Sequence, residues 1–384
     1  MLPSPRIRLR PKPSRCRSKS SMWWSKSRTP AGRQRSRKYK IREGEEVMKT
    51  LKAMLVACVA GMVMPAHAQA QESWDAVVDA AKKEGKVVVY DMALGAPYFI
   101  AVLKSFEAKY GIPVESLDLR ASELSERIRT EQSAGRYLGD VEMISSTMIE
   151  EQLQKGDFIE RLPAIPNAAH LRPPFHATEY SVPAFVQPMG ILINTRMVKD
   201  DEVPKSWDDL LDPKWKGKIL SDDMRPLGSG NTMFAILEHK MGPEFNAKLA
   251  EQKPVFSRDM RNDARRVARG EYAIYVPQIF AFTSDLKGLP VKVVVPKEGA
   301  PYAEMDSAVL KNAPHPNAAR LFIQHFLDME SQLIYANAWM PPVVAGVAER
   351  ANPDAQPFAN APLLGPAKLA ERPSMIELAK KLYP

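Results

Sequence analysis

The alternation of short strand-like runs with amphipathic helical patterns is the feature that most constrains the fold of this chain. Strand-like runs at 87–90, 114–119 and 141–144 are separated by helical patterns over 98–110 and 123–134. The first run is wholly apolar, which is typical of a strand buried on both faces of a sheet. Strands and helices that alternate at such short intervals predict βαβ units, and therefore an α/β fold with a mostly parallel sheet.

The loops that follow the predicted strands are the first candidate binding segments, because ligands of such sheets bind at the carboxyl ends of the strands. The loop after the first strand contains Leu94 and Gly95. The third strand is followed by Ser145, Ser146 and Thr147. These side chains can donate hydrogen bonds to a ligand or can only cap the next helix, and the sequence leaves both roles open.

A glycine-serine loop after a strand at 219–220 is the second candidate. Gly228, Ser229 and Gly230 let the backbone approach a ligand closely, and Asn231 or Thr232 can cap the helix that follows. The free N–H groups of a helix start suit an anion. An ordinary loop that opens a helix is the alternative, but the position at a strand end favours a ligand clamp.

Four further side chains lie near the ends of predicted strands in this half of the chain. Arg225 and Arg258 can supply a forked, always-charged donor to a carboxylate or phosphate. Arg258 can equally be a solvated loop residue. Tyr275 and Gln278 flank the expected ligand position, so we include both in the candidate site.

Two crossings of the chain predict two lobes. The first crossing is expected over residues 180–194 and the second near 296–306. The predicted lobe 1 comprises residues 71–182 with about 303–340, and the predicted lobe 2 comprises residues 183–302 with about 341–384.

The first 70 residues differ from the rest in charge and hydropathy. Residues 1–47 contain 15 Lys and Arg against 3 Asp and Glu, and we expect a disordered basic leader that is not part of the true protein. Residues 48–70 have the charged start, short apolar segment and small-residue cleavage sites of a signal peptide, which predicts export to the periplasm. Residues 71–384 carry a net charge of −5, so the basic overall charge gives no support for nucleic-acid binding.

The part after residue 70 lacks the residue sets of common catalytic and metal sites. Cys16 and Cys58 both precede it, which excludes disulfides and thiolate metal sites there. It has no Gly-x-Ser-x-Gly motif and no spaced histidine pair, and no later apolar run reaches the ~20 residues of a membrane helix. We therefore expect a binding module without catalysis, cofactor, metal site or stable membrane insertion. A secreted enzyme on the same scaffold is the alternative.

Three segments of the chain carry a family resemblance: 204–219 (PKSWDDLLDPKWKGKI), 270–273 (GEYA) and 312–322 (NAPHPNAARLF). They resemble the extracellular solute-binding proteins of bacterial ABC importers, in the branch of ferric-ion-binding proteins. The resemblance implies the two-lobed class II periplasmic-binding-protein fold, with lobes joined by crossing hinge strands and closed around a ligand by a hinge motion. It also implies a monomer whose partners are a small-molecule solute and the importer's membrane permease subunits.

The iron-binding members of this family have an adjacent tyrosine pair a few residues past the Gly-Glu-x-Ala segment. Phe280 and Phe282 stand in that region here, and phenylalanine has no oxygen for a hard cation. The leading hypothesis is therefore a small anion, held by helix N-termini with Arg225 or Arg258 as counter-charge. A ferric ion bound with a captured anion stays open. So does a cationic or phosphorylated solute, such as a polyamine or thiamine derivative, stacked on Tyr275 and Phe280.

Overall fold

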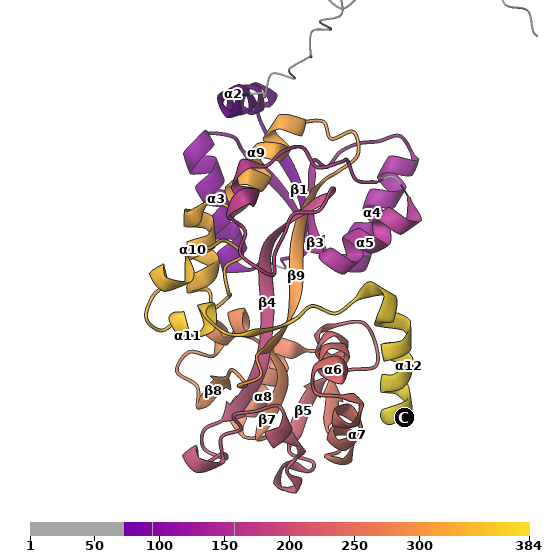
Figure 1. Cartoon of the computed structure of the whole chain (residues 1–384), viewed down its shortest axis with the longest axis vertical. Coiled ribbons are helices and arrows are strands. Elements are labelled where there is room, and N and C mark those ends of the chain that lie inside the picture. The colour runs from indigo at the N-terminus through magenta and orange to yellow at the C-terminus, as the bar shows by residue number, and fades with distance from the viewer. Residues whose placement is uncertain (1–72, 94, 157) are drawn as a thin grey trace, which may run out of the picture. The chain divides into compact units, whose positions relative to one another are not determined.

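This computed structural model describes residues 73–93, 95–156 and 158–384. Their strands form a sheet with the order β2-β1-β3-β9-β4-β7-β5-β6, to which β8 and β10 are attached (Figure 1). The α/β class predicted from the sequence is confirmed. The predictions for the leader at 1–47, the signal peptide at 48–70 and Leu94 lie outside the described residues.

Lobe 1 is built on three parallel strands, because β1 (Val87–Asp91) pairs in parallel with both β2 (Val114–Asp118) and β3 (Val141–Ser145). The carboxyl ends of these strands therefore share one edge of the sheet. The helices of this lobe are α2 (Trp74–Glu84), α3 (Pro97–Tyr110), α4 (Ala121–Ser133), α5 (Ser146–Lys155), α9 (Pro316–Phe326) and α10 (Met329–Asn337).

Lobe 2 repeats the parallel arrangement, because β5 (Ile219–Asp222) pairs in parallel with β6 (Val255–Ser257) and β7 (Ile274–Ile279). Strand β8 (Val291–Val294) lies antiparallel to β4. The helices of lobe 2 are α6 (Ser229–Lys240), α7 (Pro243–Glu251) and α8 (Met260–Arg269).

Two long strands run through both lobes (Figure 1). Residues 181–188 of β4 (Ser181–Asn194) pair with β9, whereas its residues 189–194 pair with β7 and β8. Strand β9 (Ala300–Val309) pairs with β3 and β4. Both crossings expected from the sequence coincide with these strands. The residue at which each lobe begins stays a prediction, since a shared strand belongs to both lobes.

The chain after α10 contributes three short elements that reach from one lobe to the other. They are α11 (Gln356–Ala359), β10 (Leu363–Gly365) and α12 (Arg372–Leu382). Helix α11 contacts α10 of lobe 1, whereas α12 packs beside α6 and α7 of lobe 2 (Figure 1). Arg372 at the start of α12 pairs with Glu151 of α5, with the guanidinium nitrogen 2.6 Å from the carboxylate oxygen.

The segments that carried the family resemblance lie in the core. Trp207 is fully buried, and its indole Nε1 donates to the Gly299 carbonyl oxygen at 2.9 Å. Leu321 and Phe322 of α9 are fully buried, which explains the apolar spacing of that helix. None of the described helices is long and apolar enough to cross a membrane.

Candidate ligand-binding cleft

A cleft of about 830 Å³ lies where the two lobes meet. Met92 and Ala93 line it just after β1, and Gly228 and Ser229 line it between β5 and α6. Met189 of the crossing strand β4 also contributes to the lining. The cleft is therefore bounded by the carboxyl ends of parallel strands from both lobes, and its volume is in the range of small-molecule sites.

The structure brings together five of the thirteen candidate residues as lining of this cleft: Ser145, Thr147, Gly228, Ser229 and Asn231. Seven others do not line it: Gly95, Ser146, Arg225, Gly230, Arg258, Tyr275 and Gln278. The lining residues come from both predicted segments, the one after β3 and the one before α6. Solute contact at each of them stays a prediction.

The start of α6 is occupied by a carboxylate of the protein itself. Asp222, at the end of β5, accepts hydrogen bonds at Oδ2 from the Ser229 hydroxyl at 2.7 Å and from the Gly230 N–H at 2.8 Å. Asp222 is only 7% exposed, and burial raises the pKa of its carboxyl, while Ser229, Gly230 and Arg258 oppose that rise. Asp222 thus takes the place that the sequence analysis gave to an external anion.

Capping of α6 by Asn231 is a prediction that the structure contradicts. The helix begins at Ser229, so Asn231 lies within its first turn, where its Nδ2 donates to the Met224 carbonyl oxygen at 2.8 Å. Gly230 cannot be replaced without a rearrangement, because an added Cβ would lie 2.4 Å from the Asp222 carbonyl oxygen. The glycine therefore serves the close approach of this loop to its own strand, rather than the close approach of a ligand.

The start of α5 differs. Ser145 is its N-cap residue but makes no side-chain capping bond; its Oγ instead lies 3.3 Å from Thr147 Oγ1. Both hydroxyl groups belong to the cleft lining. Among the described residues, no side chain accepts from the first N–H groups of α5 as Asp222 accepts from those of α6.

The two arginines singled out from the sequence are not part of the cleft wall. Arg225 is held by Asp223 through Nε at 2.9 Å and Nη2 at 3.1 Å, and its guanidinium lies 5.1 Å from the centre of the Phe256 ring. This pairing lowers the pKa of Asp223 against the opposing effect of burial. Arg258 is exposed and does not line the cleft.

Tyr275 and Gln278 line a separate void of about 10 Å³, which is room for about one water molecule. Tyr275 is 1% exposed, and burial raises the pKa of its phenol well above the usual value. Gln278 is bonded to Thr283 and to the Ile279 carbonyl. The Phe280 ring is fully buried against Phe358, so the expected stacking of Tyr275 and Phe280 on a solute does not fit this structure.

Arg120 is one of the cleft residues that were not identified from the sequence. Arg120 follows β2 and precedes α4, and it lines the cleft. It occupies the same kind of position as Ser145, which was recognised, namely the carboxyl end of a parallel strand in lobe 1. The position after a predicted strand at 114–119 was the available signal.

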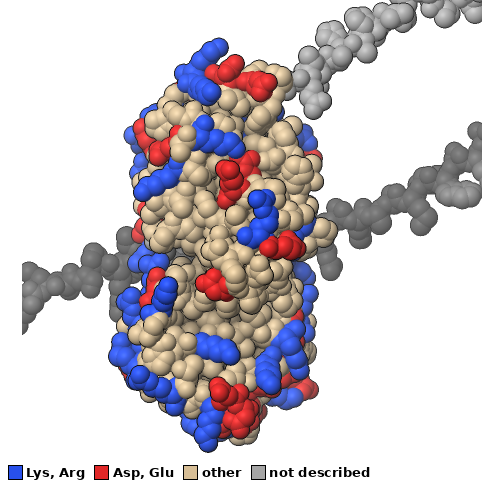
Figure 2. All heavy atoms as spheres, turned by 90° about the vertical axis from the view of Figure 1, so that its left-hand side faces the viewer, with Lys and Arg blue, Asp and Glu red and all other residues tan. Residues whose placement is uncertain are grey.

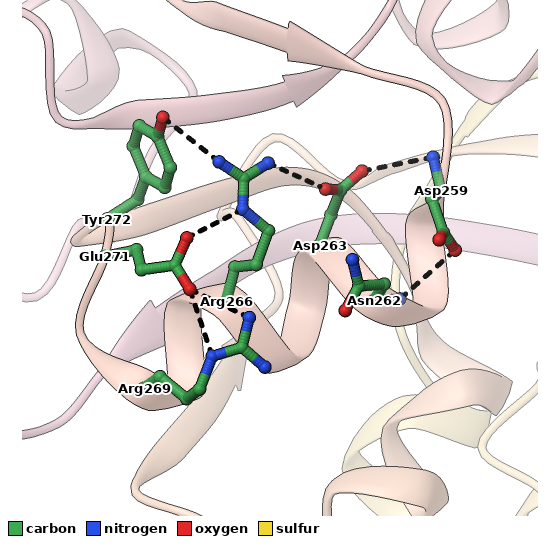
Figure 3. Close-up of polar contacts among 7 residues, drawn as sticks. All are labelled: Asp259, Asn262, Asp263, Arg266, Arg269, Glu271 and Tyr272. Carbon is green, nitrogen blue, oxygen red and sulfur yellow. Dashed lines mark hydrogen bonds and ion pairs between the residues drawn. The ribbon is translucent and has the colours of Figure 1, made fainter.

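Arg266 and Arg269 of the basic helix α8 are paired with neighbouring side chains (Figure 3). Arg266 donates to Glu271 at 2.8 Å, to Asp263 at 3.2 Å and to the Tyr272 hydroxyl at 3.3 Å. Arg269 also donates to Glu271, at 2.8 Å. On the face of the molecule seen in Figure 2, Lys and Arg are interspersed with Asp and Glu. In the described part of the chain, no group of three or more His, Cys, Asp or Glu side chains is placed to hold a metal ion.

Crossing strands between two α/β lobes, with a cleft where the lobes meet, are the features of the class II periplasmic-binding-protein fold. Residues 140–361, more than half of the chain, match the family of bacterial extracellular solute-binding proteins. The chain belongs to this family. The fold class and the family predicted from the sequence are both confirmed.

Known relatives span different shares of the chain. An uncharacterized protein of Haemophilus influenzae is 31% identical over 155 residues, which cover 38% of this chain and 45% of that protein. Iron-bound HitA from Pseudomonas aeruginosa superposes with a TM-score of 0.63 at 20% identity, covering 78% of this chain and 99% of that one. AfuA from Actinobacillus pleuropneumoniae, with fructose-6-phosphate bound, gives a TM-score of 0.57 at 20% identity, covering 77% and 97%.

Proposed function

We propose that this protein is the solute-binding component of an ABC-type importer in the periplasm. It captures a small organic anion in the interlobe cleft and delivers it, as a monomer and without catalysis, to the membrane permease subunits. Family membership supports the transport role. The solved relatives named above carry an iron ion or a sugar phosphate in their structures, which is consistent with a small polar or charged solute.

The charged residues that line the cleft are the observation that favours an anionic solute. The charged lining consists of five cations, Arg120, Arg129, Lys155, Lys368 and Arg372, against two anions, Glu126 and Glu151. A cleft lined mainly by one sign of charge raises the local concentration of the opposite ion and speeds its association. The absence of the tyrosine pair at Phe280 and Phe282 argues against a ferric ion held by phenolates.

A thermal-shift screen tests this proposal, because a ligand that binds only the native state raises the melting temperature. The panel contains small carboxylates, phosphate esters, Fe³⁺, thiamine and putrescine. We expect the largest rise from an organic anion. A rise with Fe³⁺ alone, or with the cationic solutes alone, would contradict the anion assignment while leaving the transport role in place.

A further inference from the structure

The charged side chains of the cleft are distributed unequally between the lobes. Those of lobe 1 lie on or beside α4 and α5, and two more, Lys368 and Arg372, come from the C-terminal segment. Between residues 227 and 282 of lobe 2, the lining residues are all uncharged: Leu227, Gly228, Ser229, Asn231, Thr232, Ala235, Met260, Ile279 and Phe282. A charged solute group therefore finds counter-charge on lobe 1 and on the C-terminal segment, but none on the loop before α6, on α6 itself or on the residues of β7 and α8 that line the cleft.

Arg120 is the cation of this lining that no carboxylate of the described residues neutralises. Arg129 is paired with Glu126 at 2.5 Å, and Lys155 and Arg372 both pair with Glu151. Lys368 is paired with Glu371 at 3.1 Å. Since Arg120 is exposed and stands at the carboxyl end of β2, its guanidinium is available for a forked contact with a carboxylate or phosphate.

Asp222 makes lobe 2 unfavourable for a second anion. Its buried carboxylate already accepts the Ser229 hydroxyl and the Gly230 N–H. A solute carboxylate brought to the same loop would lose these donors to Asp222 and would meet a like charge. Arg261, another cation of lobe 2, lies outside this lining, with its guanidinium over the Phe282 ring at 4.9 Å and paired with Asp285 at 3.6 Å.

Large apolar side chains cover much of the remaining wall. Five of them are methionines, Met92, Met148, Met189, Met260 and Met305, joined by Leu227, Phe158, Phe282, Ile128 and Ile279. Leu227 is 53% exposed at the mouth of the α6 loop. Methionine adapts its shape to a ligand and makes favourable contacts with aromatic rings. A hydrophilic solute would not make apolar contacts with this wall, whereas the apolar part of a solute would cover the wall and remove its surface from water.

We propose that the solute is an organic anion with an apolar body, bound with its charged group on Arg120 of lobe 1 and its body against the methionine-rich wall. This inference rests on the proposed function and adds to it a substrate class and an orientation. It assigns Arg120 as the residue that selects for charge and Asp222 as the residue that excludes charge from lobe 2.

Four probes that vary charge and hydrophobicity independently test the substrate class. They are 4-phenylbutyrate, 4-phenylbutylamine, gluconate and glucamine, titrated into the full chain by calorimetry. We expect 4-phenylbutyrate to bind at least roughly ten times more tightly than gluconate, since its phenyl ring and CH₂ groups are removed from water on the apolar wall. Equal or tighter binding of gluconate would overturn the apolar class and leave the anion proposal intact. Tighter binding of 4-phenylbutylamine would overturn the anion proposal as well, and no binding of any probe would overturn the inference alone.

Two matched variants test the orientation. Arg120→Gln removes the charge of an exposed arginine at a strand end in the cleft, and Arg258→Gln does the same at a strand end outside it. We expect Arg120→Gln to weaken 4-phenylbutyrate roughly tenfold to a hundredfold, the range of a charge-assisted hydrogen bond, and Arg258→Gln to leave it within about twofold. Unchanged melting temperatures of the free variants confirm folding. A larger loss in Arg258→Gln than in Arg120→Gln would overturn the orientation.

Discussion

The starts of α5 and α6 look alike in sequence and differ in chemistry. Each follows a parallel strand, each begins among serine, threonine or glycine, and each borders the same cleft. The α6 start is capped by Asp222, whereas no described side chain caps the α5 start. A helix start in a cleft is therefore open to an external anion only where the preceding strand does not already supply one, and this depends on a single side chain at the strand end.

A second buried carboxylate, Asp306 in β9, can be compared with Asp222. Asp306 accepts fewer hydrogen bonds than Asp222 does. Asp306 Oδ2 accepts the Ser181 hydroxyl at 2.6 Å, but its Oδ1 is buried without a partner among the described residues. Burial, with Glu304 and Glu150 adding to it and Ser181 and His176 opposing it, raises the pKa of Asp306 from 3.8 to about 7. Because the pKa of Asp306 is higher in the folded state than in the unfolded state, at a pH between the two pKa values the folded protein holds a proton on Asp306 that the unfolded chain has lost.

The free energy of unfolding should therefore fall as the pH rises from about 4 to 7, by roughly 3 kcal/mol from this group. Asp306→Asn keeps the shape and removes the titration, so we expect a flatter dependence on pH in urea unfolding. Burial raises the pKa of Glu142 to about 8, although its hydrogen bond with Gln152 opposes the rise. Glu142 therefore still contributes to the pH dependence of stability in the Asp306→Asn variant. An unchanged slope between pH 4 and 7 in Asp306→Asn would show that Asp306 is ionised throughout.

Removal of the internal cap gives the next largest effect. Asp222→Ala leaves the Ser229 hydroxyl and the Gly230 N–H without their acceptor, and we expect a loss of about 2 kcal/mol in unfolding free energy. Ser145→Ala at the start of α5 removes no capping bond, so we expect a loss below about 0.5 kcal/mol. Urea unfolding of the two variants at one pH compares the helix starts directly. Equal losses of unfolding free energy in Asp222→Ala and Ser145→Ala would mean that Asp222 does not cap α6 more strongly than Ser145 caps α5.

The ion pair between Arg372 and Glu151 joins a helix packed on lobe 2 to a helix of lobe 1, so we expect it to favour the closed cleft. Arg372→Gln should cost less than about 1 kcal/mol in stability, since both side chains are partly exposed at 19% and 33%. We expect it to speed dissociation of 4-phenylbutyrate a few-fold in stopped-flow measurements. The control is Lys380→Gln, which breaks a pair with Glu377 inside α12 alone. The same dissociation rate in both variants would refute a role of the interlobe pair.

The sequence predicted the architecture well because its signals are local. Short apolar strands, glycine-ended helices and the 204–219 segment each depend on neighbours in the chain, and the βαβ alternation follows from them. Part of the cleft lining was predicted for the same reason: Ser145, Thr147, Gly228, Ser229 and Asn231 lie between a strand end and the first turn of the next helix, and they line the cleft.

The other features of the cleft depend on the direction in which side chains point. The spacing of residues along the sequence does not reveal that direction. Arg225 and Arg120 both follow strands, yet Asp223 holds Arg225 away from the cleft lining. Asp222 is next to the loop in the sequence. Its hydrogen bond from the Gly230 N–H, however, depends on how β5 and α6 are placed in space, and the sequence does not show that. Neither Arg225 nor Arg258, the expected counter-charges, lines the cleft, whereas Arg120 of lobe 1 does.

A crystal structure with 4-(4-bromophenyl)butyrate tests the central claim most directly, since the anomalous signal of bromine fixes the orientation of the probe. The account predicts bromine on the methionine-rich wall and the carboxylate within hydrogen-bonding distance of the Arg120 guanidinium, with Asp222 still bonded to Ser229 and Gly230. A carboxylate bound at Ser229 and Gly230, with Asp222 displaced, would contradict it.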